Sequence, residues 1–216
     1  MGLGRFLIRR LIPVAALGGL AAAAASVLRQ RRNPEPFPAS QARLLDNPIA
    51  RASARKTVEL MGLAPGMRVL DVGAGIGRIS LPAAKLVAPD GIVVALDIQQ
   101  EMLDLLGKRA ADAGVGNIES VRAGAGDGVI VANSFDRAIL SSVLGEIPEE
   151  RRRPALQEVF DALKPGGVLF VSEVLAGDPH FQTRRATREL GESVGFEARS
   201  SRRGLGHLTE LVKPAN

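Results

Sequence analysis

The chain has 216 residues, a formal net charge of +5 and 46% hydrophobic residues, which is enough for one domain of ordinary size plus a short appendage. It has no cysteine, which excludes disulfides, thiolate metal sites and a thiol nucleophile, and its 2 histidines make a histidine-based metal centre unexpected. Without Trp or Tyr, and with 7 scattered Phe, it lacks the aromatic platforms on which single-stranded nucleic acids stack, so we expect no nucleic-acid partner.

An uncharged segment at residues 11–28, with arginines on both flanks, reads LIPVAALGGLAAAAASVL. As a helix it would span roughly 27 Å, slightly less than the roughly 30 Å hydrocarbon core of a bilayer. We therefore predict a membrane-anchor helix within residues 1–32, with an interfacial helix or a cleaved export signal as alternatives. Residues 1–60 carry 10 Lys and Arg against 3 Asp and Glu, a basic excess that suits an anionic membrane surface.

Residues 33–46 follow as a predicted linker, because prolines at positions 34, 36 and 38 favour a stiff, extended chain. From residue 47 the hydrophobic pattern becomes regular, and we predict one domain at 47–216. Helices are expected at 47–63, 78–87, 99–113 and 148–163, alternating with strands at 67–72, 92–97, 118–122, 135–140 and 168–174. This alternation indicates a parallel sheet covered by helices on both faces. A helix at 181–194 and a hairpin of strands at 196–201 and 207–212 complete the domain, so one of these strands should be antiparallel.

The loop after the first predicted strand carries three glycines, in the run Asp71-Val72-Gly73-Ala74-Gly75-Ile76-Gly77. Glycines at a strand-to-helix turn let the backbone approach a ligand, and an acid closing the second strand, here Asp97, can accept both hydroxyls of a ribose. The spacing G-x-G-x-G differs from the dinucleotide pattern G-x-G-x-x-G. We therefore predict a nucleoside site and treat a nicotinamide-dependent reductase as the less favoured alternative.

Four segments together resemble the class I S-adenosylmethionine-dependent methyltransferases, the group that contains quinone-biosynthesis C-methyltransferases and small phospholipid N-methyltransferases. They are VLDVGAGIGRIS at 69–80, VVALDIQQEML at 93–103, SFDRAIL at 134–140 and LKPGGVLFVSEV at 163–174. The resemblance implies an α/β, Rossmann-like, seven-stranded and mostly parallel sheet whose last strand is antiparallel. It also implies S-adenosylmethionine as the cofactor.

The resemblance assigns cofactor-binding roles to particular residues. Gly73, Gly75 and Gly77 would face the methionine part of S-adenosylmethionine, and Asp71 would position the loop or the ammonium group. Asp97 would hold the ribose hydroxyls, and Ile98 would pack on the adenine. The acid that relatives carry before the fourth strand is replaced here by Ala123-Gly124-Ala125, so Ala125 is the expected contact and the adenine edge is left to Asp127 or to backbone alone.

The sulfonium of S-adenosylmethionine is already activated, so methyl transfer needs neither a nucleophilic residue nor a metal, and we expect no metal site. A general base helps when the acceptor must lose a proton. Glu146, Glu173 and His180 follow strand ends on the side where such sites open, and they are the candidate catalytic residues, with surface or helix-capping roles as alternatives. His207 is expected to be structural. Arg151, Arg152 and Arg153 are expected to form a solvated helix face paired with Glu149 and Glu150.

The sequence thus predicts S-adenosylmethionine-dependent methyl transfer to a small, lipophilic or membrane-borne acceptor. The catalytic domain is expected in the cytoplasm, where S-adenosylmethionine is made, and anchored to the membrane. A non-catalytic protein that binds S-adenosylmethionine or a partner is the alternative, motivated by the altered adenine segment. The pattern indicates neither the methylated atom nor the oligomeric state.

Overall fold

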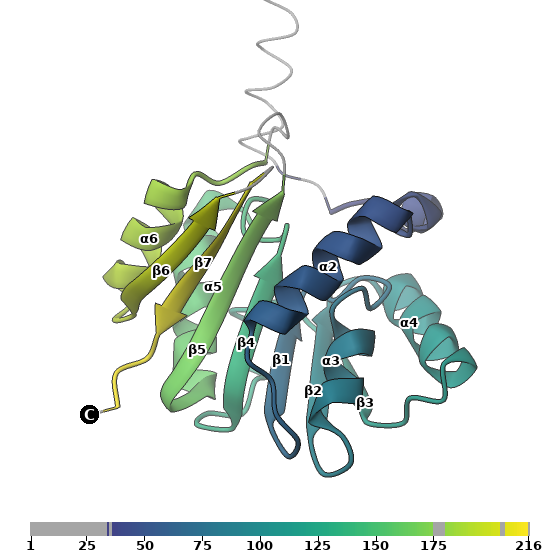
Figure 1. Ribbon diagram of the computed structural model, residues 1–216. Coiled ribbons are helices and arrows are strands. Elements are labelled where there is room, and N and C mark those ends of the chain that lie inside the picture. The colour runs from purple at the N-terminus through teal and green to yellow at the C-terminus, as the bar shows by residue number, and fades with distance from the viewer. Residues whose placement is uncertain (1–33, 35, 175–179, 204–205, 216) are drawn as a thin grey trace, which may run out of the picture.

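A seven-stranded sheet with the order β3-β2-β1-β4-β5-β7-β6 forms the centre of the protein (Figure 1). The computed structural model describes residues 34, 36–174, 180–203 and 206–215. The strands are β1 (Arg68–Val72), β2 (Ile92–Asp97), β3 (Ile118–Arg122), β4 (Phe135–Ser141), β5 (Leu163–Val174), β6 (Glu197–Arg203) and β7 (Gly206–Val212). β1 to β5 run parallel, and β7 is antiparallel to both β5 and β6. The predicted Rossmann-like mixed sheet with an antiparallel last strand is confirmed.

Helices cover both faces of the sheet. α2 (Pro48–Leu60), α3 (Ser80–Val87) and α4 (Gln100–Asp112) lie on one face, and α5 (Glu149–Ala162) and α6 (Arg184–Ser193) lie on the other (Figure 1). Neighbouring residues of one strand therefore serve opposite cores: Val69 packs with α2 and α3, whereas Leu70 packs with α5, and both are fully buried. Burial on both faces explains why β2 is continuously apolar from Ile92 to Leu96.

The boundaries differ from the predicted ones mainly where a side chain caps a helix or a strand is irregular. α6 begins at Arg184, after Thr183, whose hydroxyl accepts a hydrogen bond from the backbone N–H of Ala186 at 3.2 Å. β5 already begins at Leu163, in a segment whose sequence predicts only a turn, because Leu163 pairs with Phe135 before the register shifts.

Residues 36–46, which we call the strap, pack on the domain although their sequence predicts a linker. Ala39–Leu45 form a 3-10 helix, η1, and Ala42, only 3% exposed, packs against Ile76 and Met102. The carbonyl oxygen of Phe37 accepts a hydrogen bond from Gln99 Nε2 at 2.9 Å. The strap thus lies across the start of α4, beside the glycine loop.

An ion-pair cluster fixes the end of the strap. The carboxylate of Asp46 lies 2.7 Å from Arg51 Nε and 3.1 Å from Arg109 Nη1, so it joins the strap to α2 and to α4. The hydrogen bond from Arg51, with that from Arg109, lowers the pKa of Asp46 to about 2.

The carboxyl ends of the parallel strands form one edge of the sheet, which we call the carboxyl edge. α2 begins at the level of this edge, and the described chain enters there (Figure 1). None of the helices in the described ranges is both long and apolar enough to cross a bilayer. The predicted anchor at residues 11–28 lies outside the described residues.

Lys213 fixes the last residues of the chain at the opposite edge. Its Nζ donates to the carbonyl oxygen of Leu163 at 2.7 Å and to Asn133 Oδ1 at 3.1 Å, and it lies 5.0 Å from the centre of the Phe160 ring. The tail after β7 is thereby held against the start of β5.

Candidate functional site: two cavities at the carboxyl edge

The glycine loop after β1 has the backbone geometry that its sequence predicts. Gly73, Gly75 and Gly77 all have positive φ angles, of 68°, 52° and 79°. A Cβ on Gly73 would lie 2.3 Å from Val143 Cγ2, so a side chain there would collide with the segment after β4. A Cβ on Gly75, in contrast, would meet nothing within 4 Å. The loop therefore packs tightly on the protein at Gly73 and stays open at Gly75.

Asp97, at the end of β2, is tied to this loop by backbone hydrogen bonds. Its Oδ2 accepts from the N–H of Gly75 at 2.8 Å, and its Oδ1 accepts from the N–H of Gln99 at 2.9 Å. The residue is only 8% exposed. Since a carboxylate oxygen has two acceptor sites, each oxygen can still accept one hydroxyl of a bound ribose.

A cavity of about 220 Å³, which we call the nucleoside cavity, lies against this carboxylate. It brings together Gly73, Asp97, Ile98, Ala125 and Glu146 of the predicted site residues. Ile98 is 50% exposed, so its apolar face is available to a planar base. Residues that the sequence did not single out as site residues also line the cavity, namely Pro36 of the strap, Val143, Ile147, Pro148 and Arg151.

The charge of the nucleoside cavity is negative, because Asp97, Asp127 and Glu146 outnumber Arg151 among its lining residues. This balance suits a ligand that carries cationic groups. The pattern of glycines and acids could predict part of this wall, but Pro36 and Arg151 reach it from elements distant in sequence. Only the fold brings them there.

Asp127 lies at the adenine end that the resemblance predicts. Its Oδ2 accepts from the N–H of Gly124 at 2.8 Å, and its Oδ1 lies 2.6 Å from Arg151 Nη2. The hydrogen bond from Gly124, followed by that from Arg151, lowers the pKa of Asp127. Asp127 thus folds back onto the Ala123–Ala125 segment.

The three arginines of α5 differ from their expected pairing with Glu149 and Glu150. Arg151 pairs with Asp127. Arg152 Nε donates to the carbonyl oxygens of Ile147 at 2.9 Å and Leu144 at 3.1 Å, and Arg153 Nη2 donates to that of Ser193 at 3.2 Å. Backbone carbonyl oxygens of the turn before α5 are close enough to accept from Arg152, and a sequence pattern cannot predict such backbone partners. The contacts of Arg152 hold the segment that separates the two cavities.

Asp71 lies beneath the glycine loop and lines neither cavity. It is 2% exposed, and Ser80 Oγ, at the start of α3, donates to its Oδ2 at 2.5 Å. Burial raises the pKa of Asp71 to about 6, although the hydrogen bond from Ser80 opposes this shift. The residue connects β1 to the first turn of α3 across the loop.

A larger cavity, of about 470 Å³, lies between α2 and the ends of β4, β5 and β7. Its lining includes apolar side chains of α2, such as Ile49, Ala54 and Leu60, and polar groups at the strand ends: Ser141, Ser142, Ser172, Glu173 and His207, with Arg78 from the glycine loop. Consecutive residues, Ser142 and Val143, line one cavity each. The two cavities therefore lie on either side of one turn.

Ser142 and Glu173 occupy unusual positions in the larger cavity. Ser142 has a φ angle of 57°, a left-handed conformation that a serine rarely adopts. Glu173 is 4% exposed, and the N–H of Gln182 lies 3.5 Å from its Oε2. Strained backbone and a buried acid are features that concentrate at functional sites.

The three candidate catalytic residues do not meet in one cavity. Glu146 lines the nucleoside cavity, Glu173 lines the larger one, and His180 lines neither. The backbone at His180 passes very close to Gly145. A Cβ on Gly145 would lie 1.6 Å from the His180 carbonyl oxygen. From the sequence alone, all three residues could be predicted to lie at one edge of the sheet. Which cavity each residue lines could not be predicted.

His207 has hydrogen bonds at both ring nitrogens. Nε2 lies 2.9 Å from the carbonyl oxygen of Gln182, which can only accept, so Nε2 carries the proton. Nδ1 lies 3.0 Å from Thr209 Oγ1, which then donates to it. Burial lowers the pKa of His207, which favours this neutral form. The residue thus holds β7 to the segment before α6, in keeping with its expected structural role.

Comparison with known proteins adds the family to this geometry. Residues 69–167 match the family model described as a methyltransferase domain. The segment from β1 to the start of β5 is thus similar to a methyltransferase domain, and the fold is the Rossmann-like fold of S-adenosylmethionine-dependent methyltransferases. Among curated relatives, the ubiquinone/menaquinone biosynthesis C-methyltransferase UbiE of Vibrio cholerae serotype O1 is 34% identical over 131 residues, and that of Ectopseudomonas mendocina is 37% identical over 131 residues. In both cases the match covers 60% of this chain and 50% of the relative, so the chain spans about half the length of these curated relatives.

Solved structures share the class I fold at low sequence identity. A S-adenosylmethionine-dependent methyltransferase from Aquifex aeolicus has a TM-score of 0.72 and 22% identity over 82% of this chain and 97% of that chain. The [4+2]-cyclase SpnF has a TM-score of 0.67 and 18% identity over 77% of this chain and 82% of that chain. Because a protein named as a cyclase shares the fold, the fold alone does not decide the reaction.

Proposed function

We propose that the protein transfers the methyl group of S-adenosylmethionine to a small, lipophilic acceptor that is dissolved in or attached to a membrane. The observation that carries this proposal is the pair of cavities on either side of the Ser142–Val143 turn. One has the acid, glycine and apolar groups of a nucleoside site, and the other is large enough for a separate molecule. S-adenosylmethionine supplies an activated methyl group bonded to a sulfonium.

The cofactor residues receive roles from their contacts. Asp97 holds the ribose, since both of its oxygens are fixed at the nucleoside cavity by backbone N–H groups. Ile98 and Ala125 line the adenine end, and Gly73, which lines the same cavity, lets the methionine part approach the backbone. Gly75 and Gly77 line neither cavity and contribute through the positive φ angles that shape the loop. Asp71 positions the loop through Ser80 and does not bind the ammonium group itself. These roles fit a cofactor with a cationic sulfonium, because the nucleoside cavity is negatively charged.

The larger cavity would receive the acceptor. Its apolar wall on α2 faces polar groups at the strand ends, which suits a molecule with a polar ring and an apolar tail. The curated relatives are named as ubiquinone/menaquinone C-methyltransferases, and a quinone-type acceptor has this chemistry. Glu173 is our candidate base for a ring hydroxyl, and Arg78 would stabilise the resulting oxyanion, since both line this cavity. Glu146, which lines the nucleoside cavity, is the second candidate, and the position of His180 outside both cavities argues against it.

The proposed anchor at residues 11–28 would keep the domain beside the bilayer with its cavities in the cytoplasm. Such a tether raises the effective concentration of a membrane-dissolved acceptor. Deleting residues 1–32 should leave cofactor affinity unchanged, because the strap and both cavities lie after residue 33. The same deletion should lower activity on acceptor in vesicles far more than on acceptor dispersed in detergent. Equal activity of both forms on vesicles would contradict a role of the anchor in substrate access.

The test of the reaction is methyl transfer from tritium-labelled S-adenosylmethionine into a membrane extract, followed by mass spectrometry of the labelled lipid. Glu173→Gln should lower kcat at neutral pH, and activity should recover partly as the pH rises, because hydroxide can replace the lost base. Glu197→Gln, an exposed acid on β6, is the matched control and should behave as wild type. Binding of S-adenosylmethionine with no label in any lipid would instead support the non-catalytic alternative.

A further inference from the structure

Two large apolar side chains, five positions apart in sequence, are exposed at the junction of the strap and α2. Leu44 is 66% exposed and Ile49 is 76% exposed, and exposed Pro48 lies between them. We call Leu44, Pro48 and Ile49 the corner. Single exposed apolar residues are ordinary on a protein surface. Two of them at one turn expose enough apolar surface that transfer from water into an apolar phase would be favourable.

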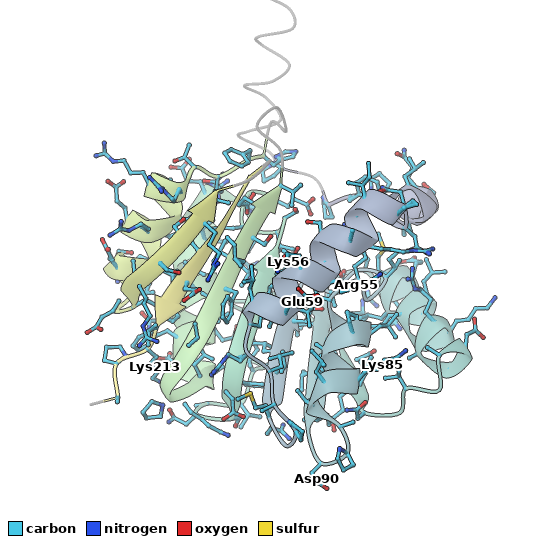
Figure 2. The ribbon with its side chains drawn as sticks, viewed as in Figure 1. Arg55, Lys56, Glu59, Lys85, Asp90 and Lys213 are labelled. Carbon is cyan, nitrogen blue, oxygen red and sulfur yellow. The ribbon has the colours of Figure 1, made fainter. Side chains whose placement is uncertain are left out.

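The surface next to the corner is basic. α2 exposes Arg51, Arg55 and Lys56, and Figure 2 shows Arg55 and Lys56 on the outer side of this helix. Arg51 pairs with Asp46 and Lys56 pairs with Glu59, so the three cations exceed these two acids by one. Arg202, also exposed, lines the opposite wall of the larger cavity. Apolar side chains at a tip with cations behind them are the arrangement by which proteins dock at the surface of an anionic bilayer.

Another exposed apolar pair lies elsewhere and has a different charge environment. Val129 and Val131, 49% and 69% exposed, are in the connection between β3 and β4. The charged residues that contact this connection include Glu158, which accepts from the N–H of Ile130 at 2.9 Å. The acids beside this connection, Glu158 and Asp127, outnumber Arg151. At the corner the exposed cations of α2 outnumber the acids Asp46 and Glu59, so the balance of charge, and not exposure alone, selects the corner.

The corner borders the larger cavity, because Asn47, Ile49, Ala50 and Ser53 line that cavity. We propose that the corner inserts into the headgroup region of an anionic bilayer, with α2 facing the lipid, so that the larger cavity opens directly to the membrane. This inference rests on the proposed function, in which the acceptor comes from the membrane. It adds the surface that docks and the route by which a lipophilic molecule would enter.

The sequence before the corner is compatible with this orientation. Position 36, where the strap begins, follows position 28, the end of the uncharged segment, by eight steps along the chain. Fully extended, eight steps reach at most roughly 28 Å. An anchor within residues 11–28 would thus keep the carboxyl edge, where the described chain enters, close to the bilayer (Figure 1).

The test uses the full-length chain, whose lack of cysteine allows one labelled position at a time. Leu44→Cys and Ile49→Cys are labelled with an environment-sensitive fluorophore and reconstituted in vesicles of phosphatidylcholine mixed with phosphatidylglycerol, with spin-labelled lipid as quencher. Val131→Cys is the matched apolar control, and Asp90→Cys reports the opposite edge (Figure 2). Retained S-adenosylmethionine binding confirms that each labelled protein is folded.

We expect a blue shift and strong quenching at positions 44 and 49, and neither at 131 or 90. Arg55→Gln in the Ile49→Cys chain should weaken the quenching, as should vesicles of phosphatidylcholine alone, whereas Lys85→Gln on α3 should not. Quenching at 49 no stronger than at 131, in protein that still floats with the vesicles, overturns the docking surface and leaves the anchor intact. Protein that does not float overturns both. Insertion at 49 without any methyl transfer supports the docking and overturns only the proposed reaction.

Discussion

Replacing Asp97 by asparagine, whose side chain has nearly the same shape, tests whether the carboxylate itself is needed at the nucleoside site. Both carboxylate oxygens accept backbone hydrogen bonds, from Gly75 at 2.8 Å and Gln99 at 2.9 Å. An asparagine has one oxygen, so its NH₂ group must face one of these two N–H donors. Leaving one buried donor unpaired costs about 1–3 kcal/mol, and Asp97→Asn should lower the free energy of unfolding by this amount even without cofactor.

The same substitution removes one acceptor for the ribose. A hydrogen bond to a charged group contributes about 1.5–3 kcal/mol, so affinity for S-adenosylmethionine should fall about 10- to 150-fold. Calorimetric titration measures the affinity, and urea denaturation of the unliganded protein measures the stability. Asp112→Asn, an exposed acid at the end of α4, should leave both unchanged. An affinity within about twofold of wild type would refute the assignment of Asp97 to the ribose.

Three further predictions concern groups around the site. Because the pKa of Asp71 is raised to about 6, the folded chain holds a proton that the unfolded chain releases near pH 4. The contribution of this group to the free energy of unfolding therefore falls as the pH rises from about 4 to about 6. In urea denaturation, the free energy of unfolding of Asp71→Asn relative to wild type should increase by roughly 1–3 kcal/mol between pH 4 and pH 7. Glu158→Gln should lower the melting temperature and weaken S-adenosylmethionine binding severalfold, because Glu158 accepts from the backbone of the segment at the adenine end, and exposed Glu119→Gln should do neither. Lys213→Met should lower the free energy of unfolding by about 1–3 kcal/mol, because the hydrogen bonds of its ammonium group are lost. The cofactor affinity measured by calorimetry should not change, since Lys213 lies at the edge of the sheet opposite the cavities. A loss of affinity would contradict this independence of the two edges.

Much of the fold follows from periodicity alone. The strands at 92–97 and 118–122 are found at their predicted bounds, and turn-forming pairs, Asp90-Gly91 and Gly116-Asn117, directly precede them. The strap is different: its prolines predict an extended chain, and its packing depends on one small residue, Ala42, fitting between Ile76 and Met102. Such a contact between distant segments leaves no period in the sequence.

The site was predictable to the extent that the β1–α3–β2 unit forms it. The glycines follow β1 and Asp97 ends the neighbouring parallel strand β2, so their spacing already places them together. Arg151 reaches the nucleoside cavity from α5 by pairing with Asp127, and α2 supplies a wall of the larger cavity. These contributions depend on how helices cross the sheet, which the order of residues does not specify.

The positions of the chain ends have a practical consequence for measuring this protein. The strap enters at the carboxyl edge, whereas Lys213 holds the tail against the start of β5 at the other edge (Figure 1). A sensor chip that captures the protein through a tag after residue 216 would leave both cavities facing the flowing solution. Capture through a tag placed directly before the strap would turn those cavities toward the matrix. The same geometry would let a fluorescent reporter fused at the carboxyl end point away from a supported bilayer, where it would not obstruct access to the lipid.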